Sequence, residues 1–365
     1  MSDVLKNQYL PDSVSPPGET LLEVLSTRGM SQAELADRTG RPTKTINEIV
    51  KGKTAITPET ALQFELVLGV SASFWNNREQ QYREALARRK ETESLATQVG
   101  WLDRIPYKPM MKMGWIPETN NKIQLIQHLL MFFGVASPRS WNDVWATTQT
   151  SFRQSPTLKS DPGAVAAWLR KGEIDALKVP VAEFDSNRFR EALGRIRGLT
   201  KDLPNNFASI VVTECSRAGV KVVFVPELPK TCTWGATKWL SQSNALIQLS
   251  LRYKTDDHLW FTFFHEAAHI LLHGKRTVIV ETEDRTKDEK ELEADSFAQE
   301  WLIPQAEYRK FRRLDSRSCA AISRFAYELG IAPGIVVGRL QHDGILARTN
   351  CNHLKKQVGW ADSGK

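Results

Sequence analysis

Cysteine is scarce in this chain, and the few cysteines lie far apart. The 365 residues contain four of them, without any Cys-x-x-Cys pair: Cys215, Cys232, Cys319 and Cys351. Closely spaced cysteines are what zinc fingers and disulfide-rich secreted domains require. The sequence therefore predicts reduced thiols rather than a disulfide framework or a zinc finger.

Long apolar runs are also absent. No segment approaches the roughly 20 consecutive apolar residues that cross a bilayer. The first residues lack the basic start and apolar core of a secretory signal. Together with the expected reduced thiols, these absences predict a cytoplasmic protein that does not associate with a membrane. The sequence also shows no internal repeat and no long low-complexity segment.

The length and composition are those of a globular protein with more than one core. A chain of 365 residues has room for two or three domains. Its hydrophobic fraction of 41% and charged fraction of 25% are ordinary for such proteins. The net charge of +7 modestly favours polyanionic partners, but it does not identify one.

Short helical patterns, separated by turn signals, fill residues 17–68. Ser31, followed three residues later by Glu34, has the pattern of a capping box at the start of a helix. That helix is expected to end near Gly40, and Thr43 begins the next one. A further helix is expected from Pro58, because proline is tolerated in the first helical turn.

Two of these helices match the helix-turn-helix pattern, with a positioning helix at 31–39, a turn at 40–42 and a recognition helix at 43–51. Apolar positions would pack the two helices together, leaving polar side chains for phosphates and base edges. The candidate DNA-binding residues are Arg41, Thr43, Lys44, Thr45, Asn47, Glu48 and Lys51. The alternative is a small helical bundle used only for packing or dimerisation.

The segment 31–75 resembles the Cro/repressor-type (XRE) domain, and within that group the HigA-type antitoxins. The finer resemblance rests on GKTAITPETAL at Gly52–Leu62 and on SFW at Ser73–Trp75. It covers residues 17–85 and implies that double-stranded operator DNA is a partner. It also implies a homodimer, because such domains read paired half-sites.

Residues 86–205 are expected to form a helical middle region without a chemical motif. Helical patterns occur at 122–133, 162–171 and 186–199. Five tryptophans are expected to anchor this region, namely Trp101, Trp115, Trp141, Trp145 and Trp168. The chain then becomes strand-like at 220–225 and again at 245–251.

A helix-compatible apolar run at 261–274 contains the sequence His265-Glu266-Ala267-Ala268-His269. On a helix, the two histidines lie one turn apart on the same face, so both imidazoles can reach one metal ion. Glu266 lies beside them, where a carboxylate can take a proton from an attacking water. This pattern is typical of a zinc peptidase. The alternative is a buried helix whose histidines are merely hydrogen-bonded.

A zinc site of this kind needs a third protein ligand, and the segment 291–298 offers three acids on a helical pattern. Glu291 and Asp295 share a face with the small or apolar residues that should pack on the histidine helix. Glu291 is therefore the expected ligand. Glu293, which faces a different side of the helix, is the alternative.

Three further expectations concern the surroundings of this site. Asp295 should hydrogen-bond one of the two histidine rings and fix its orientation. His273, one turn beyond His269, is a candidate oxyanion stabiliser or a supporting or solvent-facing residue. The strand-like segment 245–251 could pair with an extended peptide as an added strand.

Residues 180–348 resemble the ImmA/IrrE family of metallopeptidases. The resemblance rests on Ala218-Gly219-Val220, Gly235, FTFFHEAAHILLH, ELEADSFAQEWLIP and the later ISRFAYELGIAPGIVVGRLQHDGIL. It implies Zn²⁺ as the cofactor, held by His265, His269 and Glu291, with Glu266 as the general base. Family members with a fused repressor domain are associated with cleaving or sensing a protein partner.

These observations predict a mainly α protein with a small β-sheet in its C-terminal domain. The expected parts are a disordered arm (1–16), an all-α helix-turn-helix domain (17–85), a helical middle region (86–205), an α+β zincin-like metallopeptidase domain (206–348) and a tail (349–365). The expected function is that of a DNA-binding transcriptional regulator with a fused zinc-dependent endopeptidase. It would cleave or sense a protein partner in stress, phage or toxin–antitoxin control. The alternative is a non-catalytic HigA-like antitoxin or repressor whose metallopeptidase fold only binds a toxin or ligand.

Overall fold

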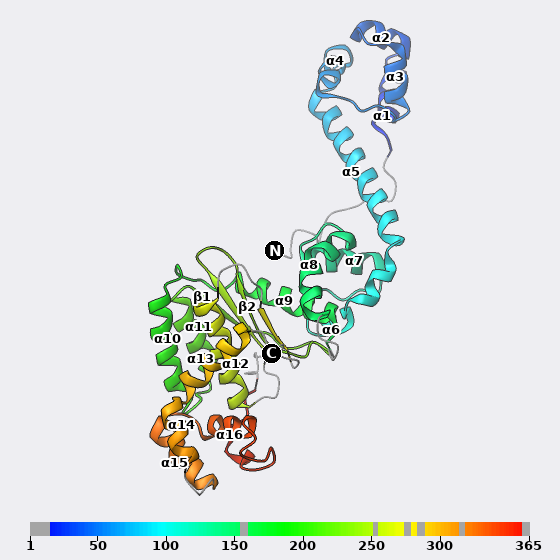
Figure 1. Cartoon of the computed structure of the whole chain (residues 1–365). Coiled ribbons are helices and arrows are strands. Elements are labelled where there is room, and N and C mark those ends of the chain that lie inside the picture. The colour runs from blue at the N-terminus through cyan, green and yellow to red at the C-terminus, as the bar shows by residue number, and fades with distance from the viewer. Residues whose placement is uncertain are drawn as a thin grey trace. The chain divides into compact units, whose positions relative to one another are not determined.

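The computed structural model describes residues 15–153, 160–250, 255–273, 279–282, 289–313 and 318–359. Backbone contacts divide the chain into two compact units, Met1–Val99 and Gly100–Lys365 (Figure 1). Most of the expected N-terminal arm, residues 1–14, lies outside the described residues.

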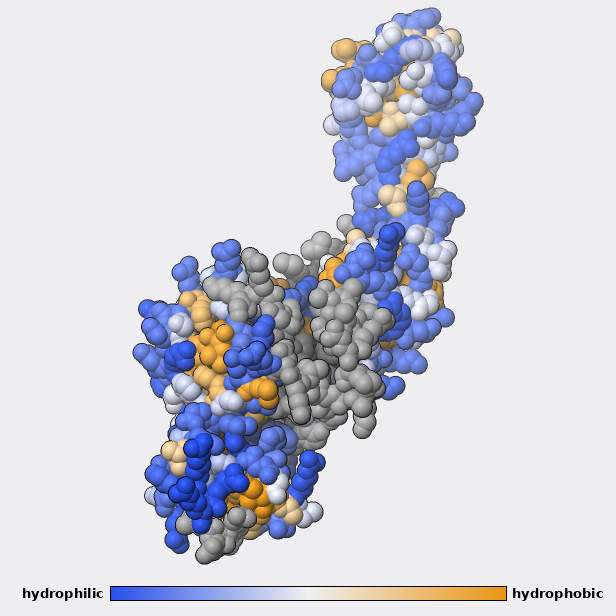
Figure 2. All heavy atoms as spheres, viewed as in Figure 1, coloured by the Kyte–Doolittle hydropathy of each residue, from blue (hydrophilic) through white to orange (hydrophobic). Residues whose placement is uncertain are grey.

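The first unit is all-helical, as predicted. Its helices are α1 (Pro17–Thr27), α2 (Gln32–Thr39), α3 (Thr43–Val50), α4 (Pro58–Leu68) and α5 (Ala72–Ala96). Their apolar faces meet in one core, which includes Leu21, Leu35, Ile46, Phe64 and Trp75. The face of this unit seen in Figure 2 is correspondingly mainly hydrophilic.

Local sequence determines where α2 and α3 begin and end. The Ser31 hydroxyl accepts a hydrogen bond from the Glu34 N–H at 3.1 Å, which caps the start of α2. Gly40 then adopts a left-handed φ of +66°, which allows the chain to turn sharply after the helix. Pro42 has a φ of −59° at the N-cap of α3, within proline's ordinary range, so it does not disturb the turn.

The second unit begins with a group of helices, several of which pack through aromatic rings. They are η1 (Val99–Arg104), α6 (Tyr107–Lys112), α7 (Lys122–Phe133), α8 (Pro138–Arg153) and α9 (Pro162–Ala176). Phe133 makes edge-to-face contacts with Trp101, Trp141 and Trp145, all of which are buried as predicted. Trp115 is only partly buried and stacks on Phe132.

Trp168 on α9 links the helical middle region to the sheet. Its indole N–H donates to the Val225 carbonyl at 3.0 Å. The Gln248 side chain of the sheet donates in turn to the Trp168 carbonyl at 2.7 Å. Both hydrogen bonds are buried and connect α9 to the sheet, in agreement with the assignment of residues 100–365 to one compact unit.

A small mixed sheet forms the centre of the second unit. Its strands are β1 (Val220–Phe224), β2 (Thr233–Trp239), β3 (Ala245–Leu249) and β4 (Ile279–Thr282), in the order β1-β3-β2-β4. The pair β1/β3 is parallel, and the pairs β2/β3 and β2/β4 are antiparallel. Because β3 is hydrogen-bonded on both sides, the prediction that 245–251 would accept a peptide as an added strand is wrong.

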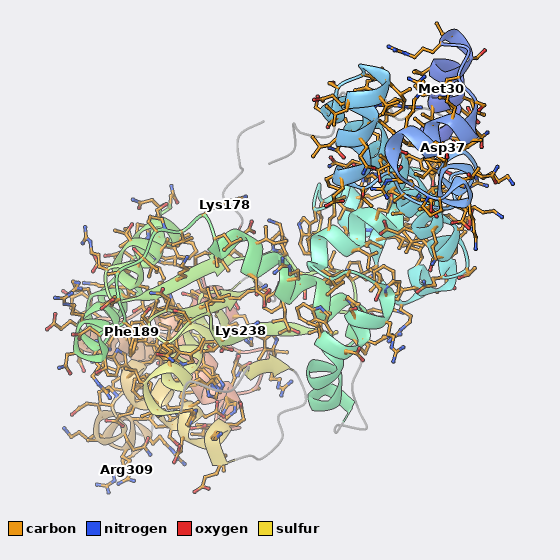
Figure 3. All side chains as sticks on the ribbon, turned by 90° about the horizontal axis from the view of Figure 1, so that it is seen from above. Met30, Asp37, Lys178, Phe189, Lys238 and Arg309 are labelled. Carbon is orange, nitrogen blue, oxygen red and sulfur yellow. A yellow bond between two sulfur atoms is a disulfide. The ribbon has the colours of Figure 1, made fainter. Side chains whose placement is uncertain are left out.

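Further helices complete the unit, and some of them pack against the sheet. They are α10 (Ser186–Leu199), α11 (Phe207–Ser216), α12 (Asp256–Leu272), α13 (Glu289–Leu302), α14 (Gln305–Arg312), α15 (Cys319–Leu329), α16 (Pro333–His342) and η2 (Asn352–Leu354). Phe189 of α10 lies inside the core and Arg309 of α14 lies at the surface (Figure 3). Helix α12, which carries the two histidines of the sequence motif, is buried along nearly its whole length.

Among the described residues, no single helix has the length and apolar character to cross a membrane. Helices α15 and α16 have sufficient length and apolar character only when they are counted as one segment. The chain bends by 116° between them.

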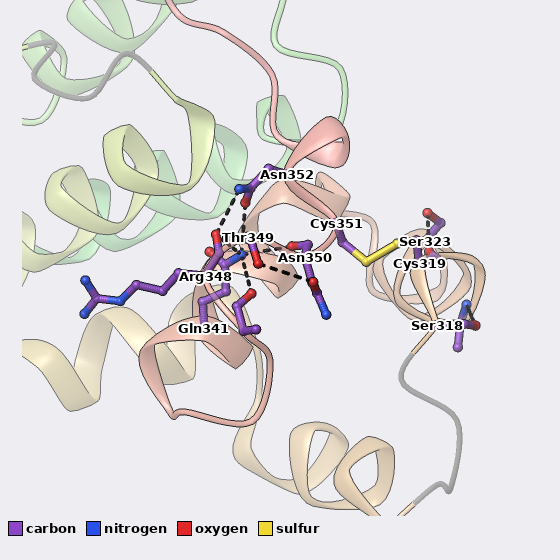
Figure 4. Close-up of a disulfide and its surroundings, with 11 residues drawn as sticks. Ser318, Cys319, Ser323, Gln341, Arg348, Thr349, Asn350, Cys351 and Asn352 are labelled. Atoms are coloured by element: carbon purple, nitrogen blue, oxygen red, sulfur yellow. Dashed lines mark hydrogen bonds between the residues drawn. A yellow bond between two sulfur atoms is a disulfide. The ribbon is translucent and has the colours of Figure 1, made fainter.

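A disulfide joins Cys319, at the start of α15, to Cys351, just before η2 (Figure 4). The prediction of four reduced thiols is therefore wrong for this pair, whereas Cys215 and Cys232 are free. The two bonded cysteines are 32 residues apart in sequence, and no local motif connects them. Only the return of the chain past α16 brings them together.

The segment that follows the disulfide holds the start of α12. The Lys355 ammonium lies 2.7 Å from the Asp257 carboxylate, and the Lys356 N–H donates to Asp256 at 3.1 Å. Val358 is buried in the same core as α12. The described part of the expected tail thus packs against the helix that carries the histidine motif.

Replacing Cys319 with serine should lower the free energy of unfolding of the second unit by about 2–4 kcal/mol, because the cross-link restricts the unfolded chain. Urea unfolding followed by far-UV circular dichroism measures the change. Cys232→Ser is the matched control and should shift stability by less than about 0.5 kcal/mol. Identical unfolding midpoints for the unsubstituted protein with and without a thiol reductant would contradict the prediction.

Candidate functional site

The side chains of the histidine motif converge in the interior of the second unit. His265 and His269 are almost fully buried, with exposed fractions of 0% and 2%. Because they are one helical turn apart on α12, their Nε2 atoms face each other at 3.0 Å. Two ring nitrogens thus point at the same small volume.

Glu291 of α13 completes this cluster. Its Oε2 lies 3.2 Å from His265 Nε2, and its Oε1 lies 3.5 Å from His269 Nε2. Glu293, the alternative third ligand, lies elsewhere and contacts His273. The structure therefore brings Glu291, not Glu293, to the ring nitrogens that face each other, as expected from the helical face that it shares with Asp295.

The separations between these donor atoms fit a zinc ion. Zinc binds histidine nitrogen and carboxylate oxygen at about 2.0–2.2 Å in tetrahedral geometry, which places neighbouring donors about 3.3 Å apart. The two Nε2 atoms lie 3.0 Å apart, and they lie 3.2 and 3.5 Å from the two different oxygens of Glu291, which are distances close to that value. Two histidines and one carboxylate are also a donor set typical of zinc hydrolases, which leave the fourth position open.

Outer hydrogen bonds hold the His265 and His269 rings in the orientation that a metal site needs. His265 Nδ1 lies 2.9 Å from Asp295 Oδ1, so its N–H donates to the carboxylate. His269 Nδ1 lies 2.8 Å from His273 Nδ1, and His273 Nε2 lies 3.0 Å from Glu293 Oε2. Donation from His269 to His273 and from His273 to Glu293 satisfies every ring N–H. Both Nε2 lone pairs then remain for a metal.

This arrangement distinguishes among the three roles predicted for His273. The ring contacts the Nδ1 side of His269, whereas the metal-facing atoms are the Nε2 atoms. His273 is therefore placed to orient His269 and not to contact a reacting carbonyl beside the cluster. Asp295 does the same for His265, as expected from the sequence.

The charge state of His269 also suits metal binding. Burial, together with the neighbouring His265, lowers the pKa of His269 to about 3. The ring is therefore neutral at neutral pH, which is the form that ligates a metal.

The side chain of Glu266 extends from α12 to β2. It is fully buried, and its carboxylate accepts a hydrogen bond from the Thr237 hydroxyl of β2. A Cβ atom at Gly235 would come within 2.5 Å of Glu266 Oε1, so only glycine leaves room for this carboxylate. The sequence did not single out Thr237, because its role depends on a strand whose pairing is not visible in local sequence.

In the first unit, the candidate DNA-binding residues share one surface around α3. Thr43, Lys44 and Lys51 are exposed, whereas the other four candidates (Arg41, Thr45, Asn47 and Glu48) are partly buried. Ile46 and Ile49 face the core. This division leaves the polar side of α3 available to DNA.

Contacts within the first unit orient several of these polar side chains. The Asn47 amide donates to Gln32 of α2 at 3.4 Å, a long contact that links the two helices. Glu48 accepts from Thr54 at 3.1 Å and lies 3.9 Å from Lys44. Gln32 was not among the predicted residues, although its place directly after the Ser31 cap could have indicated it.

Two family models match the chain over the parts just described. Residues 23–75 match the helix-turn-helix family, and residues 215–340 match the IrrE N-terminal-like domain. The chain thus combines an XRE-type helix-turn-helix domain with an IrrE/ImmA-like peptidase-family domain, as predicted. It is a DNA-binding regulator with a peptidase-like domain. No curated protein matches the chain.

Solved structures similar to the chain cover its first part. An addiction module antidote protein of the HigA family from Coxiella burnetii is 29% identical, covering 23% of this chain and 92% of its own, with a TM-score of 0.21. A protein described as an antidote of a plasmid maintenance system from Nostoc punctiforme is 25% identical, with coverages of 23% and 91% and a TM-score of 0.22. Antitoxin GraA is 25% identical, with coverages of 24% and 95% and a TM-score of 0.23.

Replacing each of the two glutamates in turn tests which of them is the third zinc ligand. Glu291→Ala should lower zinc affinity by more than the roughly 10–100-fold that loss of an outer partner costs, because it removes a direct donor. Glu293→Ala removes only a partner of His273 and should keep about one zinc per chain. Elemental analysis and competition with a zinc chelator measure both. Equal zinc affinities of the two variants would contradict the assignment of Glu291.

Substitutions on α3 test the DNA-binding surface. Asn47→Ala should weaken binding to the chain's own promoter region by about 1–3 kcal/mol if it reads a base, and Lys44→Ala should weaken binding to all sequences. A shift assay over a salt series should also show a slope reduced by about 1 for Lys44→Ala. Lys90→Ala, on the exposed part of α5, is the control. Unchanged affinity and sequence preference in both α3 variants would contradict the prediction.

Proposed function

We propose that this protein is a transcriptional regulator whose second unit is a zinc-dependent endopeptidase acting on a protein partner. The observation that carries the proposal is the convergence of His265, His269 and Glu291, together with the buried carboxylate of Glu266, the residue that follows His265 on α12. A buried carboxylate next to three convergent donors is the arrangement that metal-assisted amide hydrolysis requires. The match to the IrrE N-terminal-like domain supports the same class of activity.

Each residue of the site would have a separate role in peptide hydrolysis. His265, His269 and Glu291 would hold a zinc ion, which when bound would act as a Lewis acid towards water and the peptide carbonyl. Glu266 accepts the proton of the attacking water and passes it to the leaving amine. The Thr237 hydroxyl holds the Glu266 carboxylate against β2, so that its position is defined before substrate binds.

The outer hydrogen-bond partners keep the donors in place. Asp295 fixes the His265 ring, and His273 with Glu293 fixes the His269 ring. Preorganisation of this kind avoids reorientation of the rings when metal binds. These residues act through the histidines and do not touch the reacting atoms.

The first unit would bring this activity to operator DNA, with the protein acting as a homodimer that reads paired half-sites. The proposed partner of the second unit is a protein substrate or a toxin in stress, phage or toxin–antitoxin control. We also propose a cytoplasmic location, where an operator-binding protein acts. The scarcity of cysteine no longer supports that location, because two of the four cysteines are joined in a disulfide.

The decisive substitution is Glu266→Gln, which keeps the size of the side chain and removes the base. Zinc content and operator affinity should be unchanged, whereas cleavage should slow by at least about 100-fold. Labelling of new protein N-termini in cells that express either form would identify cleaved partners, including this chain itself. Glu328→Gln, on the exposed surface of α15, is the matched control.

The outcome decides between the two functions considered from the sequence. Cleavage products present with the unsubstituted chain and the control but absent with Glu266→Gln establish the endopeptidase. The same set of N-termini with and without Glu266 would refute it. The second unit would then only bind a toxin or ligand.

A further inference from the structure

A cavity of about 530 Å³ lies in the second unit, between α12, α13, α16 and β2. This volume is in the range of pockets that hold small ligands. Its apolar lining comes from Trp234 of β2, Phe261 of α12, Leu302 and Ile303 at and after the end of α13, and Ile335 of α16. None of the proposed metal ligands lines it, so it is distinct from the metal centre.

Two helices place this cavity one turn from the metal centre. Helix α13 runs antiparallel to α12, because Glu293 near its start contacts His273 at the end of α12. Moving from the metal centre toward the start of α12 therefore means moving toward the end of α13. One turn in this direction leads from His265 to Phe261 and from Asp295 to Gln299, and both of these residues line the cavity.

Direct contacts agree with this placement. The ring of Phe261 lies 6.2 Å from that of His265, measured between centroids. On the third side, Trp234 directly precedes Gly235, the residue that lies against Glu266 and Thr262. Thr262 itself lines the cavity. Lining residues on α12, α13 and β2 thus place the cavity next to the metal centre and the proposed base.

The charged residues that line the cavity have partners within the chain. Asp257 lies 2.7 Å from the Lys355 ammonium, and Arg339 lies 3.0 Å from the Asp343 carboxylate. Neither charge therefore needs a counter-charge from a ligand. Polar lining also comes from His258, Thr262, Gln299 and His342, and the His342 ring lies 3.2 Å from the Asp343 carboxylate. The apolar part of the lining is nevertheless larger than the polar part, so the cavity favours a neutral, apolar group.

We propose that this cavity is a specificity pocket that receives a large apolar side chain next to the scissile bond of the peptide substrate. The inference rests on the proposed function, because the metal centre defines where the scissile bond lies. It names the substrate class as peptides with an aromatic or long aliphatic residue at that position. Filling an apolar pocket beside a catalytic centre discriminates substrates by at least about tenfold.

Hydroxamic acids test the pocket without requiring a known substrate, because their head group binds zinc and their tail can occupy the neighbouring pocket. The probes are acetohydroxamic, 4-methylpentanohydroxamic, 3-phenylpropionohydroxamic and succinic monohydroxamic acids. Titration calorimetry on the zinc-loaded full chain should show that the phenyl and branched tails bind at least about tenfold more tightly than the methyl tail. The charged succinic tail should show no such gain.

Two substitutions locate the effect. Gln299→Trp should fill the cavity and remove the advantage of the phenyl tail, whereas Ser296→Trp, on the exposed side of α13, should keep it. Ile335→Ala should widen the pocket and favour the phenyl over the branched tail. Thermal melting verifies that each variant folds, and Ile335→Ala keeps the test open if Gln299→Trp does not fold.

The results separate failure of the pocket from failure of the proposed function. If acetohydroxamic acid binds and all tails bind equally, the pocket proposal is overturned and the metal centre stands. If the chain takes up no zinc, the pocket is tested on the zinc-free protein labelled with 5-fluorotryptophan. The ¹⁹F resonance of Trp234, assigned with Trp234→Phe, should shift with 3-phenylpropionamide and not with propionamide. An unchanged resonance would overturn the proposal.

Discussion

The candidate site depends on the close packing of α13 against α12. Small residues make this packing possible, because Ala268 on α12 and Ala294 and Ala298 on α13 are fully buried. Without larger side chains between them, the two backbones approach closely enough for short carboxylates to reach the histidine rings. The antiparallel direction of the two helices then determines which carboxylate contacts which ring. Glu291 contacts His265 Nε2, Asp295 contacts His265 Nδ1, and Glu293 contacts His273 Nε2.

Burying three histidine rings has an electrostatic cost, which their hydrogen bonds to partly exposed carboxylates offset. Each ring N–H has an acceptor, and the low pKa of His269 keeps that ring uncharged. What remains is a pair of Nε2 lone pairs beside the Glu291 carboxylate, a combination of donors that can coordinate a divalent cation. The same packing leaves a cavity one turn away, because α16 and β2 meet the two helices at a distance from the metal centre.

Much of the fold and part of the site could be predicted from periodicity. Glu291 was favoured over Glu293 because a 3.6-residue repeat puts Glu291 on the apolar face of its helix, and the structure places it at the histidines. Strands β2 and β4 were missed, and Thr237 with them, because a short strand gains its hydrogen bonds from residues that are distant in sequence. The Cys319–Cys351 disulfide was missed for the same reason, since 32 residues separate the two thiols.

The sequence by itself determined the local features, namely the helix-turn-helix with its Ser31 cap, the spacing of His265 and His269, and the apolar face of α13. These depend on contacts within one or two helical turns, which residue order specifies directly. Only the tertiary structure decided that His273 supports His269, that β3 is closed to a substrate strand, and that an apolar cavity borders the metal centre. Those features arise where separate elements meet, and their geometry depends on how the whole core packs.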